Sequence, residues 1–369
     1  MKKSLVALAT LSVVGSALAD IDISGGIKMY GNFDQGYTSQ DLTDPSVTSR
    51  STNYTSLFAA SATSRLGFRG TRDLGDGIKG RIQAEIEVQP DSATMFPSKN
   101  RGTFVGISKE SLGEVILGTQ ETTAYEIFGM DVNGRVEYKP QVWRATTSNS
   151  TQDRANNSLK YVSPSIAGFT AHAMRGFSDQ AASGTKYTSL GVKYNKDKLR
   201  AAYVVDQLTN TAGSYKFAGL VNAGPSNEST SWTSSALAYA GSATSAITRN
   251  IGSVSYDFGV ASVNYLYAKS FNSTTNAGSL TTHTAGIRVP YEKFAFALSY
   301  GGGTIDSYTT TGSTVVAVDG TIADTTFGIY YNLDKSTSFY LLGSTSTVSK
   351  QSVQAGKNVT TSIGARYSF

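Results

Sequence analysis

The chain has 369 residues, with 32 basic against 27 acidic side chains, 37 glycines, seven prolines and no cysteine. The lack of cysteine excludes disulfides, thiol catalysis and cysteine-ligated metals, and a net charge of only +5 does not indicate nucleic-acid binding. Tyrosine (21) and phenylalanine (16) far outnumber tryptophan (2), which together with the low proline content favours many extended segments joined by tight turns.

The N-terminal residues have the pattern of an export signal. Lys2 and Lys3 precede an apolar run over residues 5–14, and Ala17-Leu18-Ala19 lies directly before Asp20 as a small-x-small cleavage site. We therefore expect residues 1–19 to be a signal peptide and residues 20–369 to form one mature domain, with a net charge of about +3. The apolar run is too short to cross a bilayer as a helix, and no later segment offers about 20 uninterrupted apolar residues. We expect no transmembrane helix.

Side-chain alternation predicts an all-β chain of sixteen antiparallel strands. The pattern is clearest over residues 78–89, where Ile82 and Ile86 alternate with Arg81, Glu85 and Glu87. A face with so many charges cannot be the packed core of a soluble sheet. The predicted strands cover residues 21–33, 56–70, 78–88, 101–108, 114–119, 157–163, 168–177, 187–195, 199–206, 247–257, 260–271, 280–289, 294–302, 325–332, 337–347 and 359–369.

The connections alternate in length, as in a transmembrane barrel with short periplasmic turns and long extracellular loops. The seven short ones, rich in Gly, Pro, Asp and Asn, are residues 73–77, 109–113, 164–167, 196–198, 258–259, 290–293 and 333–336. The eight long ones are residues 34–55, 89–100, 120–156, 178–186, 207–246, 272–279, 303–324 and 349–358. Most long connections are rich in Ser, Thr, Asn and Gly, and we expect solvated loops there. The two longest, 120–156 and 207–246, far exceed the ~15 residues beyond which a loop is usually functional or disordered.

The last strand shows two different faces. Ile363, Ala365, Tyr367 and Phe369 alternate with small or polar residues and Arg366. In an outer-membrane barrel one face meets lipid, with aromatic residues at the membrane border, and the other meets a watery lumen. Sixteen strands leave an aqueous channel rather than a packed interior. The residues predicted to line this lumen are Lys79, Arg81, Glu85 and Arg366.

Six sequence blocks follow one another along the chain: Ser64-Arg65-Leu66-Gly67-Phe68-Arg69-Gly70-Thr71, Asp73-Leu74-Gly75-Asp76-Gly77, Arg101-Gly102-Thr103-Phe104-Val105-Gly106, Leu117-Gly118-Thr119-Gln120, Asn156-Asn157-Ser158-Leu159-Lys160-Tyr161 and Ser255-Tyr256-Asp257-Phe258-Gly259. Together they resemble the general diffusion porins of Gram-negative outer membranes, over essentially the whole mature chain. The resemblance implies a homotrimer of sixteen-stranded barrels for ion transport and passive diffusion of small hydrophilic solutes, without a cofactor. It also implies outer-membrane lipid and the outer-membrane assembly machinery as partners, with Tyr367 and Phe369 in the assembly signal.

In that family the third long loop folds inward and narrows the pore. The third long connection here contains Ile127-Phe128-Gly129-Met130-Asp131, of which Phe128, Gly129 and Asp131 match the family's turn while Ile127 and Met130 depart from it. The matching also implies a basic wall opposite this loop, formed by Arg65, Arg101 and Arg154. The acidic side implied for the constriction consists of Glu126, Asp131 and Glu137.

Opposed charges in a narrow passage create a transverse field that admits ions and polar solutes. The net basic charge favours anions whereas acids on the third loop favour cations, so the sequence leaves both signs open. A substrate-specific channel or receptor-like barrel is the alternative, but most aromatic residues fall on the outward register instead of forming a lumen track. A barrel enzyme would need a catalytic histidine, and neither His172, expected in the lumen, nor His283, expected at a loop edge, has a nucleophile motif nearby. Metal-site spacing, phosphate loops and nucleic-acid motifs are also missing from the sequence.

Overall fold

The computed structural model describes residues 21–24, 26–44, 47–56, 64–89, 100–126, 154–177, 186–209, 246–272, 279–311, 314–350 and 353–369, almost all of them in antiparallel strands. The strands are β1 (Ile21–Ser24), β2 (Ile27–Asp44), β3 (Val47–Ser56), β4 (Arg65–Gly75), β5 (Ile78–Glu87), β6 (Asn100–Lys109), β7 (Gly113–Glu121), β8 (Arg154–Val162), β9 (Phe169–Gly176), β10 (Lys186–Lys196), β11 (Leu199–Thr209), β12 (Ile247–Asp257), β13 (Ser262–Asn272), β14 (Ser279–Tyr291), β15 (Phe294–Thr311), β16 (Thr314–Asn332), β17 (Thr337–Lys350) and β18 (Val353–Ser368). No helix among these described residues is long and apolar enough to cross a membrane.

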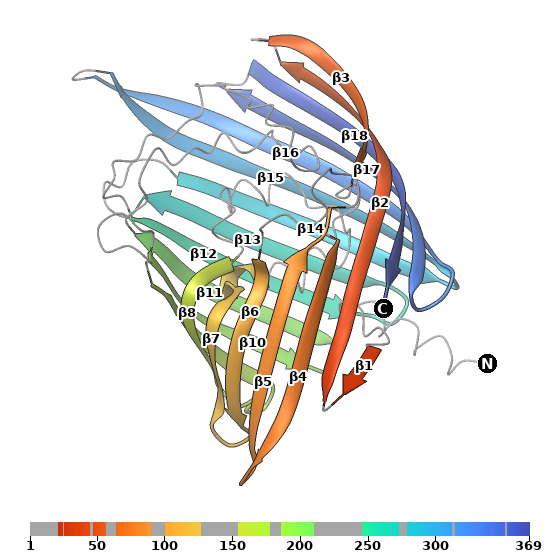
Figure 1. The fold of residues 1–369 in the computed structure, drawn as a ribbon. Coiled ribbons are helices and arrows are strands. Elements are labelled where there is room, and N and C mark those ends of the chain that lie inside the picture. Colours follow the sequence, from red (N-terminus) through yellow and green to blue (C-terminus); the bar gives the residue numbers. More distant parts are fainter. Residues whose placement is uncertain are drawn as a thin grey trace.

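The strands close into a ring (Figure 1). From β4 to β18 each strand pairs with the next, β18 pairs with β2, and β2 pairs with β4. The upper part of β2 pairs with β3, which therefore stands in line with β4, and the short β1 pairs with the lower end of β2. The described part of the chain thus has sixteen strand positions around the ring, as predicted. A closed ring leaves no long sheet edge unpaired, which is the condition for a sheet to cross a membrane.

The ends of the ring meet at the last residue. The amide of Gly31 donates to the carbonyl oxygen of Phe369 over 2.8 Å, and the amide of Phe369 donates back over 3.0 Å. The Phe369 ring lies over Gly31, stacks on Phe33 at 6.2 Å and meets Tyr367 at 6.1 Å. A Cβ atom at residue 31 would lie 2.7 Å from a carbon of this ring, so the contact requires glycine.

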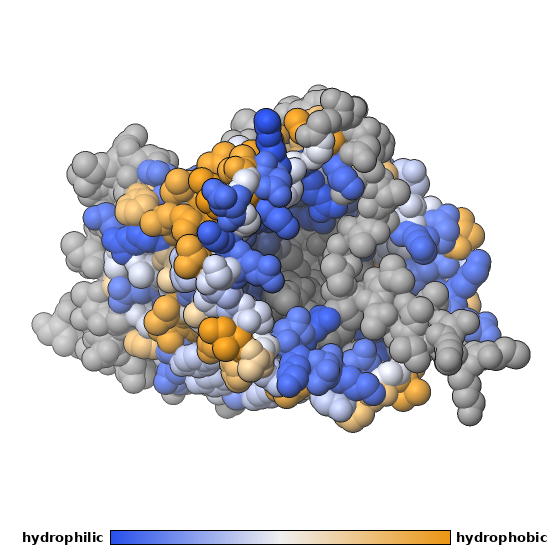
Figure 2. Space-filling view, turned by 90° about the horizontal axis from the view of Figure 1, so that it is seen from below, coloured by the Kyte–Doolittle hydropathy of each residue, from blue (hydrophilic) through white to orange (hydrophobic). Residues whose placement is uncertain are grey.

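Side chains alternate between an apolar outer face and a polar interior. Outward residues such as Val105, Leu190 and Ile363 are 54%, 65% and 60% exposed, whereas inward residues such as Glu85 and Glu87 are buried. Seen from below, hydrophilic residues border the hollow in the middle of the molecule and hydrophobic residues gather nearer its edge (Figure 2). An exposed apolar band around a polar interior is the surface expected of a barrel in lipid.

Three of the predicted loops are strands instead. Residues 34–55, 303–324 and 349–358 were expected to be solvated loops, but β2–β3, β15–β16 and β17–β18 run through them as paired ladders. In one of these hairpins, Thr309-Thr310-Thr311 at the end of β15 and Thr314-Val315-Val316 at the start of β16 are residues that favour strands. At 18 and 19 residues, β15 and β16 exceed the roughly 9–11 residues needed to cross a bilayer, whereas β7 and β8 have only nine each (Figure 1).

The first predicted strand, residues 21–33, also differs. It breaks into β1 and β2 at Gly26, whose φ of +81° is in the left-handed region that glycine adopts without strain. The second strand then continues to Asp44.

Candidate pore constriction

Arg65 and Arg101 share one carboxylate on the inner wall. Glu85 on β5 lies between them, with its Oε2 atom 3.7 Å from Nε of Arg65 on β4 and its Oε1 atom 2.7 Å from Nε of Arg101 on β6. The hydroxyl of Tyr30 also donates to Oε2 of Glu85 over 2.9 Å. Glu87, the register partner of Arg65, adds a second buried carboxylate on the same strand.

Arg154 continues the same arc of the wall on β8. It is the register partner of Glu121 on β7, and its Nη2 atom lies 2.8 Å from Oε1 of that carboxylate. The guanidinium carbon lies 5.5 Å from the centre of the Tyr125 ring. Glu121 and Tyr125 also interact electrostatically with Arg101. The structure therefore brings the three predicted arginines onto one arc, each of them paired with a carboxylate of the wall itself.

The third long connection begins with a turn inside the barrel. The amide of Glu126 donates to the carbonyl oxygen of Thr122 over 3.0 Å, and the amide of Tyr125 donates to the Thr122 hydroxyl over 3.2 Å. Ala124 is buried in an apolar cluster with inward residues of β11, β12 and β13. These residues are Val204, Ile251, Leu266 and Ala268. The chain therefore turns inward at Thr122, whereas residues 127–153, including Asp131 and Glu137, lie outside the described residues.

Glu126, predicted on the acidic side of the constriction, lies against basic side chains of the wall. Its carboxylate forms ion pairs with Lys160 on β8 and with Lys193 on β10, the latter at 2.7 Å, and lies 3.8 Å from Nδ1 of His172 on β9. Burial by itself raises the pKa of Glu126, but the two ammonium groups outweigh burial and hold the pKa at about 2, below the usual 4.5. The sequence did not identify these lysines as partners, because the contacts of a loop residue depend on where the loop meets the wall.

The comparisons with known proteins agree with this architecture. A family model described as Gram-negative porin matches residues 4–351. The chain belongs to the Gram-negative porin family. Outer membrane porin protein 32 of Delftia acidovorans is 31% identical over 228 residues, which are 58% of this chain and 62% of that protein. The chain thus aligns with less than two thirds of the length of this relative.

Two solved outer-membrane proteins match this chain in fold over more than nine tenths of its length. An anion-selective porin from Comamonas acidovorans matches with a TM-score of 0.69 and 21% identity, over 93% of this chain and 99% of that one. OmpT of Vibrio cholerae, solved in a trimer form, matches with a TM-score of 0.62 and 16% identity, over 94% and 100% of the two chains. At these identities the likeness establishes the fold alone.

The other residues predicted to line the lumen of the porin lie on its inner register. Arg81 pairs with Glu114 at 2.8 Å and stacks on Phe104, and Arg366 pairs with Asp34 at 2.9 Å. Lys79 is exposed beside the short turn between β4 and β5. His172 is inside, as expected, but His283 was predicted at a loop edge and lies within β14, on the outer face against Tyr265 and Tyr267.

Sequence reasoning missed several charged residues of the porin's interior. Lys160 and Lys193 have inward positions in β8 and β10, and alternation with Leu159, Tyr161 and Val192 could have indicated this. Asp206 and Arg249 are register partners on β11 and β12, and Nε of Arg249 donates to Oδ1 of Asp206 over 2.7 Å in a fully buried pair. Within the described residues no group of three or more His, Asp or Glu side chains could hold a metal ion.

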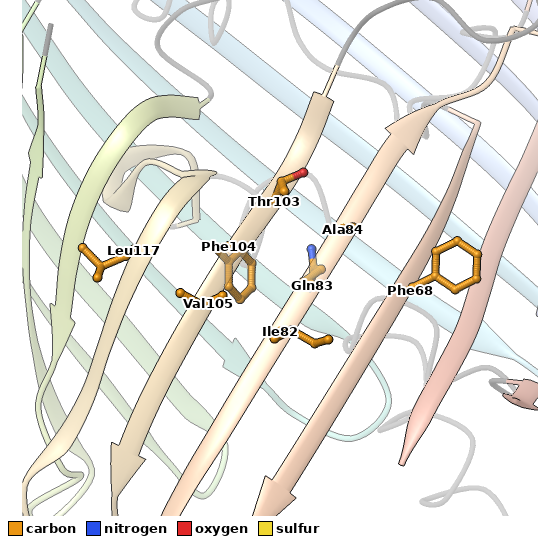
Figure 3. Close-up of a pocket in the computed structure, with 8 residues that line it drawn as sticks. All are labelled: Phe68, Ile82, Gln83, Ala84, Thr103, Phe104, Val105 and Leu117. Atoms are coloured by element: carbon orange, nitrogen blue, oxygen red, sulfur yellow. The ribbon is translucent and has the colours of Figure 1, made fainter. Parts of the chain in front are cut away.

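A groove of about 350 Å³ lies on β4 to β7 of the porin (Figure 3). Phe68, Ile82, Val105 and Leu117, which line it, belong to the exposed apolar band. A groove in this band opens toward lipid, so it is separate from the charged interior and is not a candidate site for hydrophilic solutes.

Proposed function

We propose that this protein is a multi-pass β-barrel of the Gram-negative outer membrane that forms a water-filled channel for passive diffusion of ions and small hydrophilic solutes. The observation that carries the proposal is the ring of sixteen strand positions with an apolar outside and ion pairs inside. A ring of this size leaves an aqueous channel. The proposed activity is passive, without an enzymatic reaction.

The pore is proposed to prefer anions, with Arg65, Arg101 and Arg154 as the positive side of its constriction. Two carboxylates of the inner wall and turn each serve two cations, because Glu85 pairs with both Arg65 and Arg101 and Glu126 pairs with both lysines. Fixed positive charge in a narrow passage raises the local concentration of anions. A similar barrel from Comamonas acidovorans is titled anion-selective, which supports this sign.

The assembled form is proposed to be a homotrimer of chains that begin at Asp20 after loss of residues 1–19. The Vibrio cholerae neighbour solved in a trimer form supports this assembly. Outer-membrane lipid and the outer-membrane assembly machinery are its proposed partners. Tyr367 and Phe369 are proposed to be read by that machinery.

Liposome swelling tests the proposed function. Vesicles containing the purified protein should swell in small sugars at rates that rise linearly with concentration, and should not swell in large oligosaccharides. A rate that saturates for one sugar would instead indicate a substrate-specific channel. No swelling with any solute would contradict the diffusion pore.

A further inference from the structure

Glu126 lies where three neighbouring strands present basic or imidazole side chains to the lumen. Lys160, His172 and Lys193 are inward residues of β8, β9 and β10. Lys160 approaches Oε1 of Glu126 and Lys193 approaches Oε2, so each carboxylate oxygen has its own ammonium partner. The side chain of Lys160 is only 2% exposed and that of Lys193 is 13% exposed. The two lysines are thus a cationic site that a carboxylate of the chain itself already occupies.

The turn that carries Glu126 is held on several sides. Ala124 packs on the apolar part of the wall, and Tyr125 lies beneath the guanidinium group of Arg154. Lys160 also donates from Nζ to the carbonyl oxygen of Glu121 over 3.4 Å, so one lysine contacts the chain on both sides of the turn. Of these contacts, the ion pairs have the highest cost of removal, since loss of one partner leaves buried charge without compensation.

We propose that Glu126 is a positioning and specificity-determining residue that fastens the start of the third connection to the lumen wall and masks a latent anion site formed by Lys160 and Lys193. The masking of the anion site rests on the proposed function, because it concerns which ions pass the pore. Together Glu126, Lys160 and Lys193 carry one excess positive charge. Without the carboxylate the two lysines carry two positive charges, and the turn loses its ion pairs with the wall.

Thiol labelling tests the fastening without any need for conduction. The chain contains no cysteine, so Ala124→Cys introduces a single reporter at a residue that is 1% exposed. In the purified barrel we expect slow labelling of this cysteine by a small maleimide. Adding Glu126→Gln should raise the rate at least about tenfold, since breaking a buried pair is strongly destabilising. Glu292→Gln, in an exposed turn, is the matched control and should leave the rate unchanged.

A second variant keeps this test decisive if Glu126→Gln folds poorly. Lys160→Met together with Lys193→Met removes the partners instead of the carboxylate and should expose the reporter cysteine to the same degree. Lys186→Met, on the outer register of β10, is the control for a lysine lost from the same strand. Protection of the reporter that persists in both test variants would overturn the fastening role.

Reversal potentials in a planar bilayer under a salt gradient test the masking. Glu126→Gln should shift selectivity toward anions, and the double lysine variant should shift it toward cations. Selectivity unchanged in both variants would overturn the masking even if the reporter is exposed. If the wild-type protein does not conduct at all, the proposed function fails, while the labelling result still decides whether Glu126 fastens the turn.

Discussion

Glu85 illustrates what one inward residue does in this barrel. Alternation along residues 78–89 predicted that Glu85 and Arg81 face the interior, because the side-chain period of a strand is two residues, and both lie on the inner register of β5. The sequence also grouped Arg65, Arg101 and Arg154, but it did not identify Glu85 and Glu121 as their partners. Such pairs join neighbouring strands, so they depend on strand register, which side-chain alternation leaves open.

The arginines of the arc should act together on ion selectivity. Replacement of Arg65, Arg101 and Arg154 by Ala is expected to shift the reversal potential toward cations, because it removes the fixed charge that attracts anions. The shift should be large at 0.1 M salt and small at 1 M, since the Debye length falls from ~10 Å to ~3 Å. A triple variant with the wild-type reversal potential at low salt would show that these residues are not beside the ion path. Lys186→Ala, an exposed residue on the outer register of β10, is the control.

The depressed pKa of Glu126 predicts a pH range for its effect. A carboxyl whose folded pKa is below its ordinary value contributes stability at higher pH and loses that contribution as the pH falls through the folded pKa. With a pKa of about 2, Glu126 should remain ionised at pH 4, where an ordinary glutamate is largely protonated. With His172→Gln in both proteins, so that the imidazole 3.8 Å from the carboxylate cannot titrate, the difference in reversal potential with and without Glu126→Gln should therefore be as large at pH 4 as at pH 7. A difference that halves by pH 4 would contradict the strong pairing with the two lysines.

At the scale of elements, the sequence located the membrane-crossing strands better than their ends. Strands such as β5 and β9 begin directly after turns with positive-φ residues such as Gly77 and Gly168, so their ends at the short turns were predictable. The outer ends of β15 and β16 were not, because their Thr-, Ser- and Gly-rich composition resembles that of a loop. The strand ends there depend on pairing across one long hairpin, of Ser307 with Val318 for example, which composition does not reveal.

The last strand should be more important for assembly than for conduction. Phe369 closes the ring through its backbone pairs with Gly31, and its ring packs on Phe33. Phe369→Ser is expected to lower the amount of folded protein in the outer membrane at least several-fold, while the molecules that do assemble keep the wild-type conductance. Membrane fractionation measures how much protein reaches the outer membrane, and heat-modifiable mobility on a gel measures how much of it is folded. Phe294→Ser, another exposed outward aromatic, is the control and should assemble more efficiently. Equal levels of the two variants would mean that the terminal position has no special role.

The whole molecule has a pore, which no single strand can form. Each strand contributes both an apolar and a polar face, but a pore exists only because β18 returns to β2 within the same chain. The charged arc then lies inside one barrel, on β4 to β10, and every ion pair described along it is made within a single chain. A trimer of such chains must contain three separate pores, because each chain closes its own ring.

Single-channel recordings should therefore show the proposed trimer closing in three equal conductance steps. Each step should have the same reversal potential, since each barrel carries its own Arg65, Arg101 and Lys160. The arginine triple variant should change the reversal potential of every step and leave the number of steps at three. Cross-linking of the purified protein, followed by mass measurement, should give three times the mass of the mature chain. One single step from a particle of trimeric mass would contradict independent pores, and a monomeric mass with single steps would contradict the trimer while leaving the pore intact.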